Sequence, residues 1–360
     1  MIRAFFCPAA ILTAALFALI AVAMVGLSSR AGETAAAVPL VQGADEAPES
    51  WKREWPKTDF TRTTIAFGEI VSGGPPKDGI PAIDDPAFRA LADITDLAGT
   101  EPVIGLFLGK EARAYPLRVL MWHEIVNDRI GGVPVTVTYC PLCNSAIVFD
   151  RRLGGRVLDF GTTGKLRKSD LVMYDRQTES WWQQFSGEAI IGEMAGKTLT
   201  MIASRLESFA AFKTRATKAG RTARVLVPNN RLSRRYGTNP YAGYDTVPAP
   251  FLFSGDLPDG IEPMMRVVVV DGRAWTLPLV RERGEISVKD ADGRAVVIRW
   301  RAGQNSALDT RAIAEGRDVG NVIVQRETAP GSGVFEDAVH DVTFAFVFYA
   351  FHPNGTLQTL

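Results

Sequence analysis

Residues 110–117 (KEARAYPL) decide the fold of this 360-residue chain, because a similar stretch returns further along as residues 272–279 (GRAWTLPL). Later pieces of the chain match in the same order: 124–125 with 285–286, Gly131 with Gly293, the apolar run 133–137 with 295–298, and 144–146 with 305–307. Chance similarity between two hairpins does not account for several separated pieces kept in one order. The sequence therefore predicts an internal duplication of a β module.

After the proline-rich segment that ends near residue 86, the chain has the pattern of short strands separated by turns that contain glycine. The expected strands are 103–108, 112–115, 134–139, 146–151, 156–160 and 171–174. One helix is predicted at 206–219, where Phe209, Phe212 and several alanines recur at helical spacing. We therefore expect an α+β, β-rich fold of two related β modules, the first carrying a long insertion.

Composition divides the chain into four parts. Residues 1–31 hold Arg3 followed by an uncharged apolar stretch and the small-residue run Ser28-Ser29-Arg30-Ala31, the pattern of a signal peptide. The uncharged stretch could span a bilayer if it is not cleaved, so an N-terminal anchor is the alternative. The other predicted parts are a linker at 32–60, a first β module with the insertion at 61–255, and a second β module with a closing strand at 256–360.

Charge and location limit the classes of function. Forty basic and forty acidic residues give zero net charge, so no nucleic-acid partner is expected. The N-terminal segment predicts an extracytoplasmic protein, periplasmic or secreted, that meets a membrane only through that segment if it is uncleaved. Residues 161–165 (GTTGK) superficially resemble a phosphate loop, but Asp159 replaces the first glycine and Leu166 replaces the magnesium-binding hydroxyl. No nucleotide cofactor is therefore expected.

Two cysteines, Cys140 and Cys143, lie in the run TYCPLCNS at 138–145 and are the only cysteines after the N-terminal segment. Sulfur atoms at this spacing can share one metal ion or form a small redox disulfide. The second module has no equivalent, since Gln304 aligns with Cys143. The reactive groups are therefore expected in the first module alone, with the second as a structural partner.

Three histidines are candidates for completing a site. Thiolate and imidazole ligands both suit copper and zinc, so a soft-metal site, Cu or Zn, is expected at Cys140, Cys143, His123 and His352. His340 is expected to be a solvated loop residue. Polar and aromatic residues nearby are predicted to surround the ligands or line a cleft: Glu124, Asn127, Asp128, Asp175, Arg176, Trp182 and Gln184.

Two other functions stay open. In a thiol-disulfide or electron-transfer protein, Cys140 would attack, Cys143 would resolve the mixed disulfide, and His123 would lower the thiol pKa. No βαβ pattern surrounds the motif, which argues against a thioredoxin-like frame. In a non-enzymatic interaction module, the disulfide would only shape a loop. A redox or metal-delivery partner is expected without being identified, and the sequence does not decide whether the protein is an enzyme.

Three motifs carry a resemblance to a known family: TYCPLCNSA, the upstream run WHEIVND and the downstream run MYDRQTESWWQQFSGEAIIG. Over residues 83–353 the chain resembles the bacterial domain of unknown function 3179. The resemblance implies an exported protein and brings no established reaction, substrate or cofactor. It implies a signature of His123, Glu124, Asn127, Asp128, Cys140, Cys143, Gly164, Asp175, Trp182, Gln184, Gly187 and His352.

Overall fold

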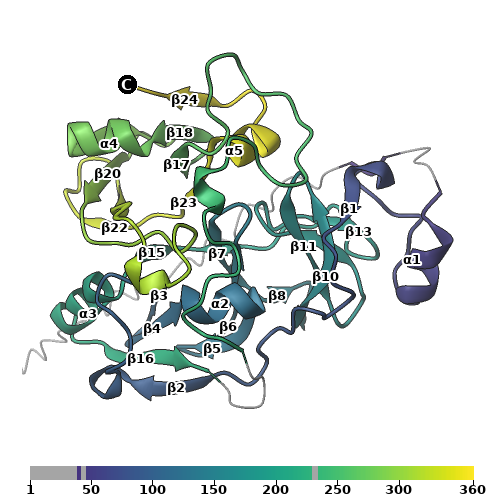
Figure 1. Ribbon diagram of the computed structural model, residues 1–360, viewed down its shortest axis with the longest axis horizontal. Helices are drawn as coiled ribbons and strands as arrows, with labels where there is room; N and C mark the ends of the chain where they lie inside the picture. The colour runs from purple at the N-terminus through teal and green to yellow at the C-terminus, as the bar shows by residue number, and fades with distance from the viewer. Residues whose placement is uncertain (1–38, 42–45, 229–233) are drawn as a thin grey trace, which may run out of the picture. The chain divides into compact units, whose positions relative to one another are not determined.

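The computed structural model describes residues 39–41, 46–228 and 234–360, and these described residues belong to one compact unit. Strands dominate this unit and its helices are short (Figure 1), which confirms the prediction of a β-rich fold. None of the helices in the described part of the chain is long and apolar enough to cross a membrane. The predicted signal peptide or anchor, 1–31, lies outside the described residues.

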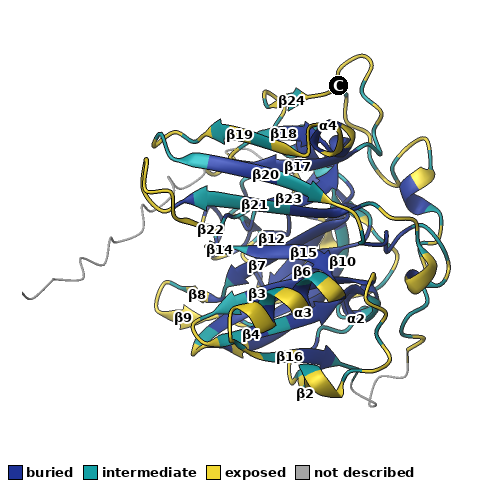
Figure 2. Ribbon diagram, turned by 90° about the vertical axis from the view of Figure 1, so that its left-hand side faces the viewer, coloured by how far each residue is buried: buried dark blue, intermediate teal, exposed yellow. Residues whose placement is uncertain are grey.

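The first large sheet has the strand order β15-β3-β4-β16-β2. Its strands are β3 (Pro102–Leu108), β4 (Glu111–Pro116), β15 (Ser204–Ser208), β16 (Thr222–Val227) and β2 (Ala87–Ala90). Helix α3 (Phe209–Lys218) joins β15 to β16, and β16 pairs with β4 in the parallel direction. Phe209 and Phe212 of α3 are buried, whereas the outer face of the helix is exposed (Figure 2).

The second sheet is the meander that carries the cysteines. It consists of β5 (Ile125–Ile130), β6 (Val133–Cys140), β7 (Ser145–Asp150) and β14 (Met201–Ile202), which pairs with β7. Helix α2 (Leu117–His123) connects β4 to β5 and buries Leu117, Val119 and Leu120. The end of α2 is therefore fixed against the meander.

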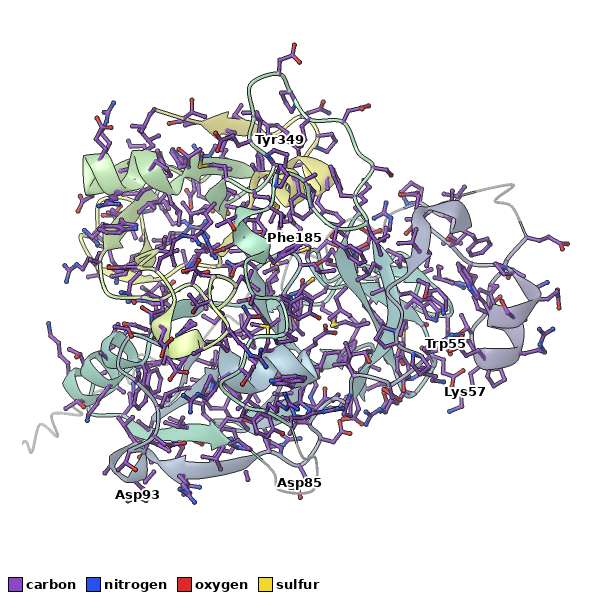
Figure 3. All side chains as sticks on the ribbon, viewed as in Figure 1. Trp55, Lys57, Asp85, Asp93, Phe185 and Tyr349 are labelled. Atoms are coloured by element: carbon purple, nitrogen blue, oxygen red, sulfur yellow. The ribbon has the colours of Figure 1, made fainter. Side chains whose placement is uncertain are left out.

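A third sheet lies between β7 and β14 in sequence, apart from its first strand. Its strands are β1 (Ile70–Ser72), β10 (Phe160–Arg167), β11 (Asp170–Asp175), β12 (Trp181–Gln183) and β13 (Ala189–Ile191), and a short hairpin, β8 (Arg152–Leu153) with β9 (Arg156–Val157), precedes β10. Helix α1 (Glu49–Glu54) and Trp55 pack beside this sheet (Figure 3), with the Trp55 and Trp181 rings 5.2 Å apart. The described part of the predicted linker thus contributes a fully buried indole.

The C-terminal part of the chain forms two four-stranded sheets. One contains β17 (Arg266–Val270), β18 (Arg273–Thr276), β23 (Asp341–Phe344) and β24 (Thr356–Gln358). The other contains β19 (Glu285–Lys289), β20 (Ala295–Arg301), β21 (Asn321–Glu327) and β22 (Phe335–Asp337). Helix α4 (Leu277–Arg283) connects β18 to β19, and α5 (Ala345–Phe351) connects β23 to β24.

The two parts of the chain have the same order of elements. Each has a hairpin, a short helix, a three-stranded meander, a strand that pairs with the end of the meander, and a strand that returns to the hairpin. A helix and a strand parallel to the hairpin follow, β16 on β4 in one part and β24 on β18 in the other. Strand β7 contacts β23 and β15 contacts β21, so each meander adjoins the hairpin sheet of the other part.

Several element boundaries differ from those predicted. The helix predicted from residue 206 begins at Phe209, because 204–208 pairs with β3 and the Ser208 hydroxyl caps the helix through the Ala211 amide. The strand predicted at 156–160 is divided between β9 and β10. Residues 305–307, aligned with the start of β7, lie in the long connection before β21 instead.

Candidate metal centre

The two cysteines lie at the turn between β6 and β7. Cys140 is the last residue of β6 and pairs with Ser145, the first residue of β7. Residues 141–144 alone therefore connect the two strands. The Cys143 amide donates to the Cys140 carbonyl at 3.2 Å, and Asn144 takes a positive φ of 51° to close the turn. This tight turn brings the sulfur atoms together, and both are free thiols.

Asp170 completes a group of three ligand atoms. The Sγ atoms of Cys140 and Cys143 and a carboxylate oxygen of Asp170 all lie within 4.8 Å of one another, and all three residues are buried. Asp170 begins β11 and is held by the Gln183 amide at 2.6 Å and the Phe185 backbone N–H at 2.9 Å, both donating to Oδ2. Its Oδ1 is buried without a hydrogen-bond partner.

The turn before Asp170 is strained. Lys168 and Ser169 connect β10 to β11 with φ angles of 54° and 67°, a region that residues other than glycine seldom occupy. The Ser169 carbonyl accepts from the thiol of Cys143 at 3.6 Å and from that of Cys140 at 4.0 Å. Arg167 pairs with Asp170, so Lys168 and Ser169 form a two-residue β-hairpin turn, a type that requires positive φ at both positions. Here it directs one carbonyl and one carboxyl group toward the same pair of sulfur atoms.

Glu124 is a fourth acidic group beside this cluster. It is the residue that ends α2, it is buried, and its φ is 57°. Burial, and then the charge of Asp170, raise the pKa of its carboxyl to about 8. In the structure Gly284, one residue before the Glu285 that aligns with Glu124 in sequence, ends α4 as Glu124 ends α2, with a φ of 70°. A glycine adopts such a conformation freely, whereas another residue stores roughly 1–3 kcal/mol of strain.

Burial shifts the pKa values of the whole cluster in one direction. It raises the pKa of the Cys140 and Cys143 thiols, and it raises the pKa of Asp170 to about 6 against the hydrogen bonds from Gln183 and Phe185. Among the described residues, no lysine or arginine forms an ion pair with Asp170 or Glu124. The cluster therefore lacks an internal positive charge to balance its ionised form.

Two tyrosines, Tyr241 and Tyr244, interact electrostatically with the cluster. Burial, followed by the charges of Glu124 and Cys140, raises the pKa of Tyr241, and burial raises that of Tyr244 to about 12. The Ser169 hydroxyl ties the same segment down by donating to the Phe251 carbonyl at 2.5 Å. Both cysteines are buried, with Cys140 2% exposed and Cys143 0% exposed.

The structure does not bring His123 to the sulfur atoms. Its Nδ1 lies 2.8 Å from the Pro81 carbonyl and its Nε2 lies 2.8 Å from the Tyr236 hydroxyl. A carbonyl only accepts, so Nδ1 carries the proton and Nε2 accepts from the tyrosine. Both ring nitrogens are thus used in holding the end of α2, and the predicted ligand role of His123 has no geometric support.

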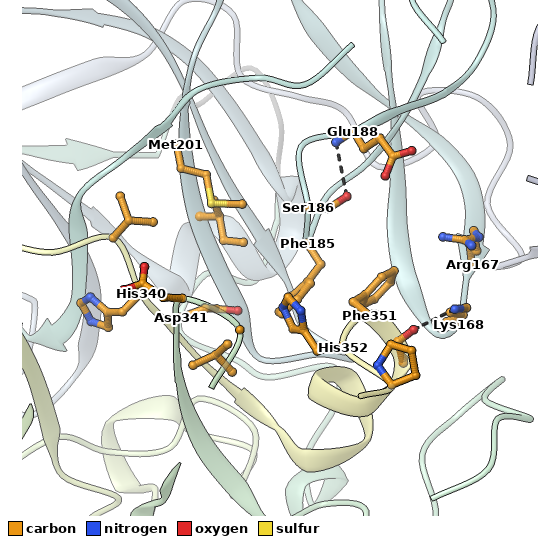
Figure 4. A pocket seen from close by; sticks show the side chains of 17 residues that line it. Arg167, Lys168, Phe185, Ser186, Glu188, Met201, His340, Asp341, Phe351 and His352 are labelled. Carbon is orange, nitrogen blue, oxygen red and sulfur yellow. Dashed lines mark hydrogen bonds between the residues drawn. The ribbon is translucent and has the colours of Figure 1, made fainter. Parts of the chain in front are cut away.

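His352 and His340 are not at the cysteines either. His352 lines a separate cavity of about 510 Å³, beside the stacked rings of Phe185 and Phe351 at 5.0 Å (Figure 4). His340 was expected to be solvated, yet it is buried, with Nδ1 donating to the Ala338 carbonyl at 2.8 Å. The group of ligand atoms found in the described residues contains no histidine, so the four-ligand set expected from sequence is not assembled.

The other predicted cleft residues connect strands. The Trp182 indole donates to Asp175 at 2.9 Å, and the Gln184 amide donates to the Thr138 hydroxyl at 2.9 Å. The remaining three form similar links: Asp128 with Arg113 and Tyr115, Arg176 with Asp84, and Asn127 with Asp84 and the Phe160 carbonyl. Of the predicted neighbours, Glu124 is the one that interacts electrostatically with the cysteine cluster.

Asp170 is not among the ligands predicted from the sequence. Its one available signal is position: it follows the pair Lys168-Ser169, which forms a two-residue turn between strands, and such a turn fixes where the next side chain lies. That signal requires knowing that β10 and β11 pack beside the β6–β7 turn. No spacing rule connects a carboxylate to cysteines about thirty residues earlier.

Comparisons with known proteins identify the family of this chain and give no information on its activity. A search of the curated proteins gave no match, and a search of the solved structures gave none. A family model does match, over residues 77–355, and its description reads "Protein of unknown function (DUF3179)". This match covers more than half of the chain and confirms the resemblance carried by the cysteine motif, so the chain belongs to that family.

Proposed function

We propose that this protein holds a zinc ion between Cys140, Cys143 and Asp170. The observation that carries the proposal is the convergence of three ligand atoms within 4.8 Å in a buried cluster. In a zinc tetrahedron, bonds of about 2.3 Å to sulfur and about 2.1 Å to oxygen separate neighbouring ligand atoms by roughly 3.5 Å. Small side-chain adjustments would bring the three atoms to that separation.

The electrostatics of the cluster support a cation. Two thiols and two carboxyl groups share a buried volume, and burial raises the pKa of each. Metal binding replaces the protons on such ligands, and the released protons make the affinity dependent on pH. Zinc would therefore supply the positive charge that the surrounding side chains lack.

Glu124 is proposed to face the fourth position of the ion. Its carboxyl lies outside the group of three ligand atoms, so we assign it to the water or ligand at that position. The strain at its backbone supports a role that glycine cannot fulfil, because the equivalent Gly284 avoids the same strain. Three protein ligands with one open position are the pattern of catalytic zinc sites.

The ligand set favours zinc over copper. Zinc accepts carboxylate oxygen together with thiolate, whereas Cu(I) is selected by thiolate and thioether sulfur. Replacing the expected histidines by Asp170 therefore moves the balance toward zinc. Thiol-disulfide exchange is less well supported, because it needs an accessible thiolate, and burial here both hides the sulfur atoms and raises their pKa.

We also propose that the protein works outside the cytoplasm and that its two parts arose by duplication. The apolar segment after Arg3 supports export, and the shared order of elements supports duplication, with β8–β13 inserted in the first copy. The second part would then be the structural partner. A zinc-delivery partner in the same compartment remains the proposed interaction.

Metal analysis of the purified full chain tests the zinc proposal. The expected result is one zinc per chain by mass spectrometry of the metals, lost in a Cys140→Ser, Cys143→Ser double variant and in Asp170→Asn. Glu207→Gln is the matched control, since Glu207 is another buried carboxyl with a pKa raised by burial, but its charged neighbours are Arg215, Arg205 and Asp337, and it lies outside the group of ligand atoms. Protein that holds no zinc and gains none from a zinc buffer would refute the proposal. If the purified protein holds copper instead, the proposed metal is copper.

A further inference from the structure

A second cavity is lined by none of the residues of the cysteine cluster, and all of its charged lining residues are positive. Its volume is about 530 Å³, and three arginines line it: Arg234, Arg235 and Arg311. Among the described residues none of these guanidinium groups forms an ion pair. Three positive charges therefore face one hollow in a chain whose net charge is zero.

The other polar groups of this cavity also donate hydrogen bonds. The Trp122 indole Nε1–H is buried without an acceptor among the described residues, and Thr238 also lines the cavity. Among the described residues no carboxylate lines this cavity, whereas at least one lines each of the three other cavities considered. A site that offers donors and positive charge together is complementary to an oxyanion.

Backbone hydrogen bonds keep the arginines together. The Asn239 amide donates to the Arg311 carbonyl at 2.8 Å, the Thr238 amide donates to the Arg235 carbonyl at 3.0 Å, and residues 238 and 312 form a β-bridge. Two segments far apart in sequence are thus joined at the cavity. These bonds hold together the backbone segments that carry the three exposed arginines, even though repulsion between their charges opposes this arrangement.

We propose that the cavity formed by Trp122, Arg234, Arg235, Thr238 and Arg311 is a binding site for a small multiply charged oxyanion, a phosphate or a polycarboxylate. Planar guanidinium groups bind both kinds of oxygen pair in a bidentate manner, and the indole N–H supplies one more donor. The volume is within the range of small-molecule sites. This site is independent of the zinc proposal, because none of its residues belongs to the cysteine cluster.

Calorimetric titration of the full chain with inorganic phosphate, and separately with citrate, tests the site. We expect saturable binding of at least one anion at low ionic strength, weakening as salt is raised. An Arg235→Gln, Arg311→Gln double variant should bind at least about tenfold more weakly, since charge-assisted hydrogen bonds are lost. Trp122→Phe keeps a ring but removes the N–H, and should give a smaller loss.

The control variant is Arg283→Gln with Arg301→Gln, which removes the same charge from exposed arginines outside the cavity. It should leave the affinity within about twofold of the parent, and thermal melting should verify that both double variants fold. Tighter binding of phosphate identifies a phosphate site, and tighter binding of citrate identifies a polycarboxylate site. Absence of saturation by either anion at about 10 mM, or equal weakening in the control, would overturn the inference.

Discussion

Two buried carboxylates, Asp245 and Asp170, face opposite electrostatic surroundings. Asp245 lies in the short 3₁₀ turn Tyr244–Thr246 and pairs with Arg266 at 2.9 Å and Arg317 at 2.8 Å. Burial alone would raise its pKa, but the two arginines and the Ser306 hydroxyl lower it below the ordinary value. The pKa of Asp170 is raised, because burial acts there without any arginine.

The difference separates a structural carboxylate from one suited to binding. A buried charge is tolerated when it is paired and hydrogen-bonded. The charge of Asp245 is balanced by its arginine partners once the chain has folded, so it needs no bound ion. Asp170, together with Glu124 and the two thiols, becomes neutral only by keeping its protons or by accepting a cation. The two clusters therefore predict different responses to mutation, to pH and to metal.

The largest expected effect comes from exchanging each aspartate for asparagine. Asp245→Asn leaves Arg266 buried without its counter-charge, and should lower the free energy of unfolding by about 3–5 kcal/mol. Asp170→Asn removes a carboxyl that lacks a positive partner, so in metal-free protein it should change stability by less than about 1 kcal/mol. Urea denaturation in the presence of a chelator measures both. Equal losses in the two variants would contradict the contrast.

A second effect is the pH dependence of metal-free stability. Glu124 and Asp170 keep their protons up to about pH 8 and about pH 6 in the folded chain, while the unfolded chain releases them near 4.5 and 3.8. Between these limits the folded state binds more protons, so the free energy of unfolding should fall as pH rises, by about 5 kcal/mol from pH 5 to 8 when both groups are counted.

Denaturation curves at several pH values, with chelator and with saturating zinc, measure this slope. Glu124→Gln should flatten it, and zinc should remove it because the ion replaces the protons. Asp245 works in the opposite direction: its lowered pKa adds stability above its ordinary titration range, which is lost as pH falls. A metal-free stability that is constant between pH 5 and 8 would show that the acidic cluster does not titrate as described.

The sequence predicts the fold better than it predicts the site. Strands such as β3 and β6 have a local pattern of apolar residues and turns, and the repeated stretch at 272–279 indicates the second hairpin, so these elements are found without coordinates. Their boundaries shift where pairing overrides local preference. Residues 206–208 are helical by pattern, yet they extend β15, because β3 offers them a partner.

The site illustrates what local patterns miss. Cys140 and Cys143 identify its position, since their spacing alone restricts the chemistry. His123 looked equally suitable, but its two nitrogens are occupied by Pro81 and Tyr236, contacts that arise only in the folded chain. Asp170 reaches the sulfur atoms through the packing of two sheets, which no spacing records. The sequence predicts Glu124 near the ligands, but its positive φ can be known only from the folded chain.

The smallest expected effect compares Glu124 with Gly284, which end equivalent helices. Glu124→Gly should relieve the strain of a positive φ, and removal of a buried carboxyl adds to this, so metal-free protein at neutral pH should gain about 1 kcal/mol in the free energy of unfolding. The same variant should bind zinc about tenfold more weakly in a chelator competition, because groups around the ligands typically contribute that much to affinity. Gly284→Glu, the reciprocal change, should lose stability without altering zinc affinity. If Glu124→Gly instead destabilises the chain and keeps full affinity, Glu124 is a structural residue and the strain at this helix end has no connection with the metal.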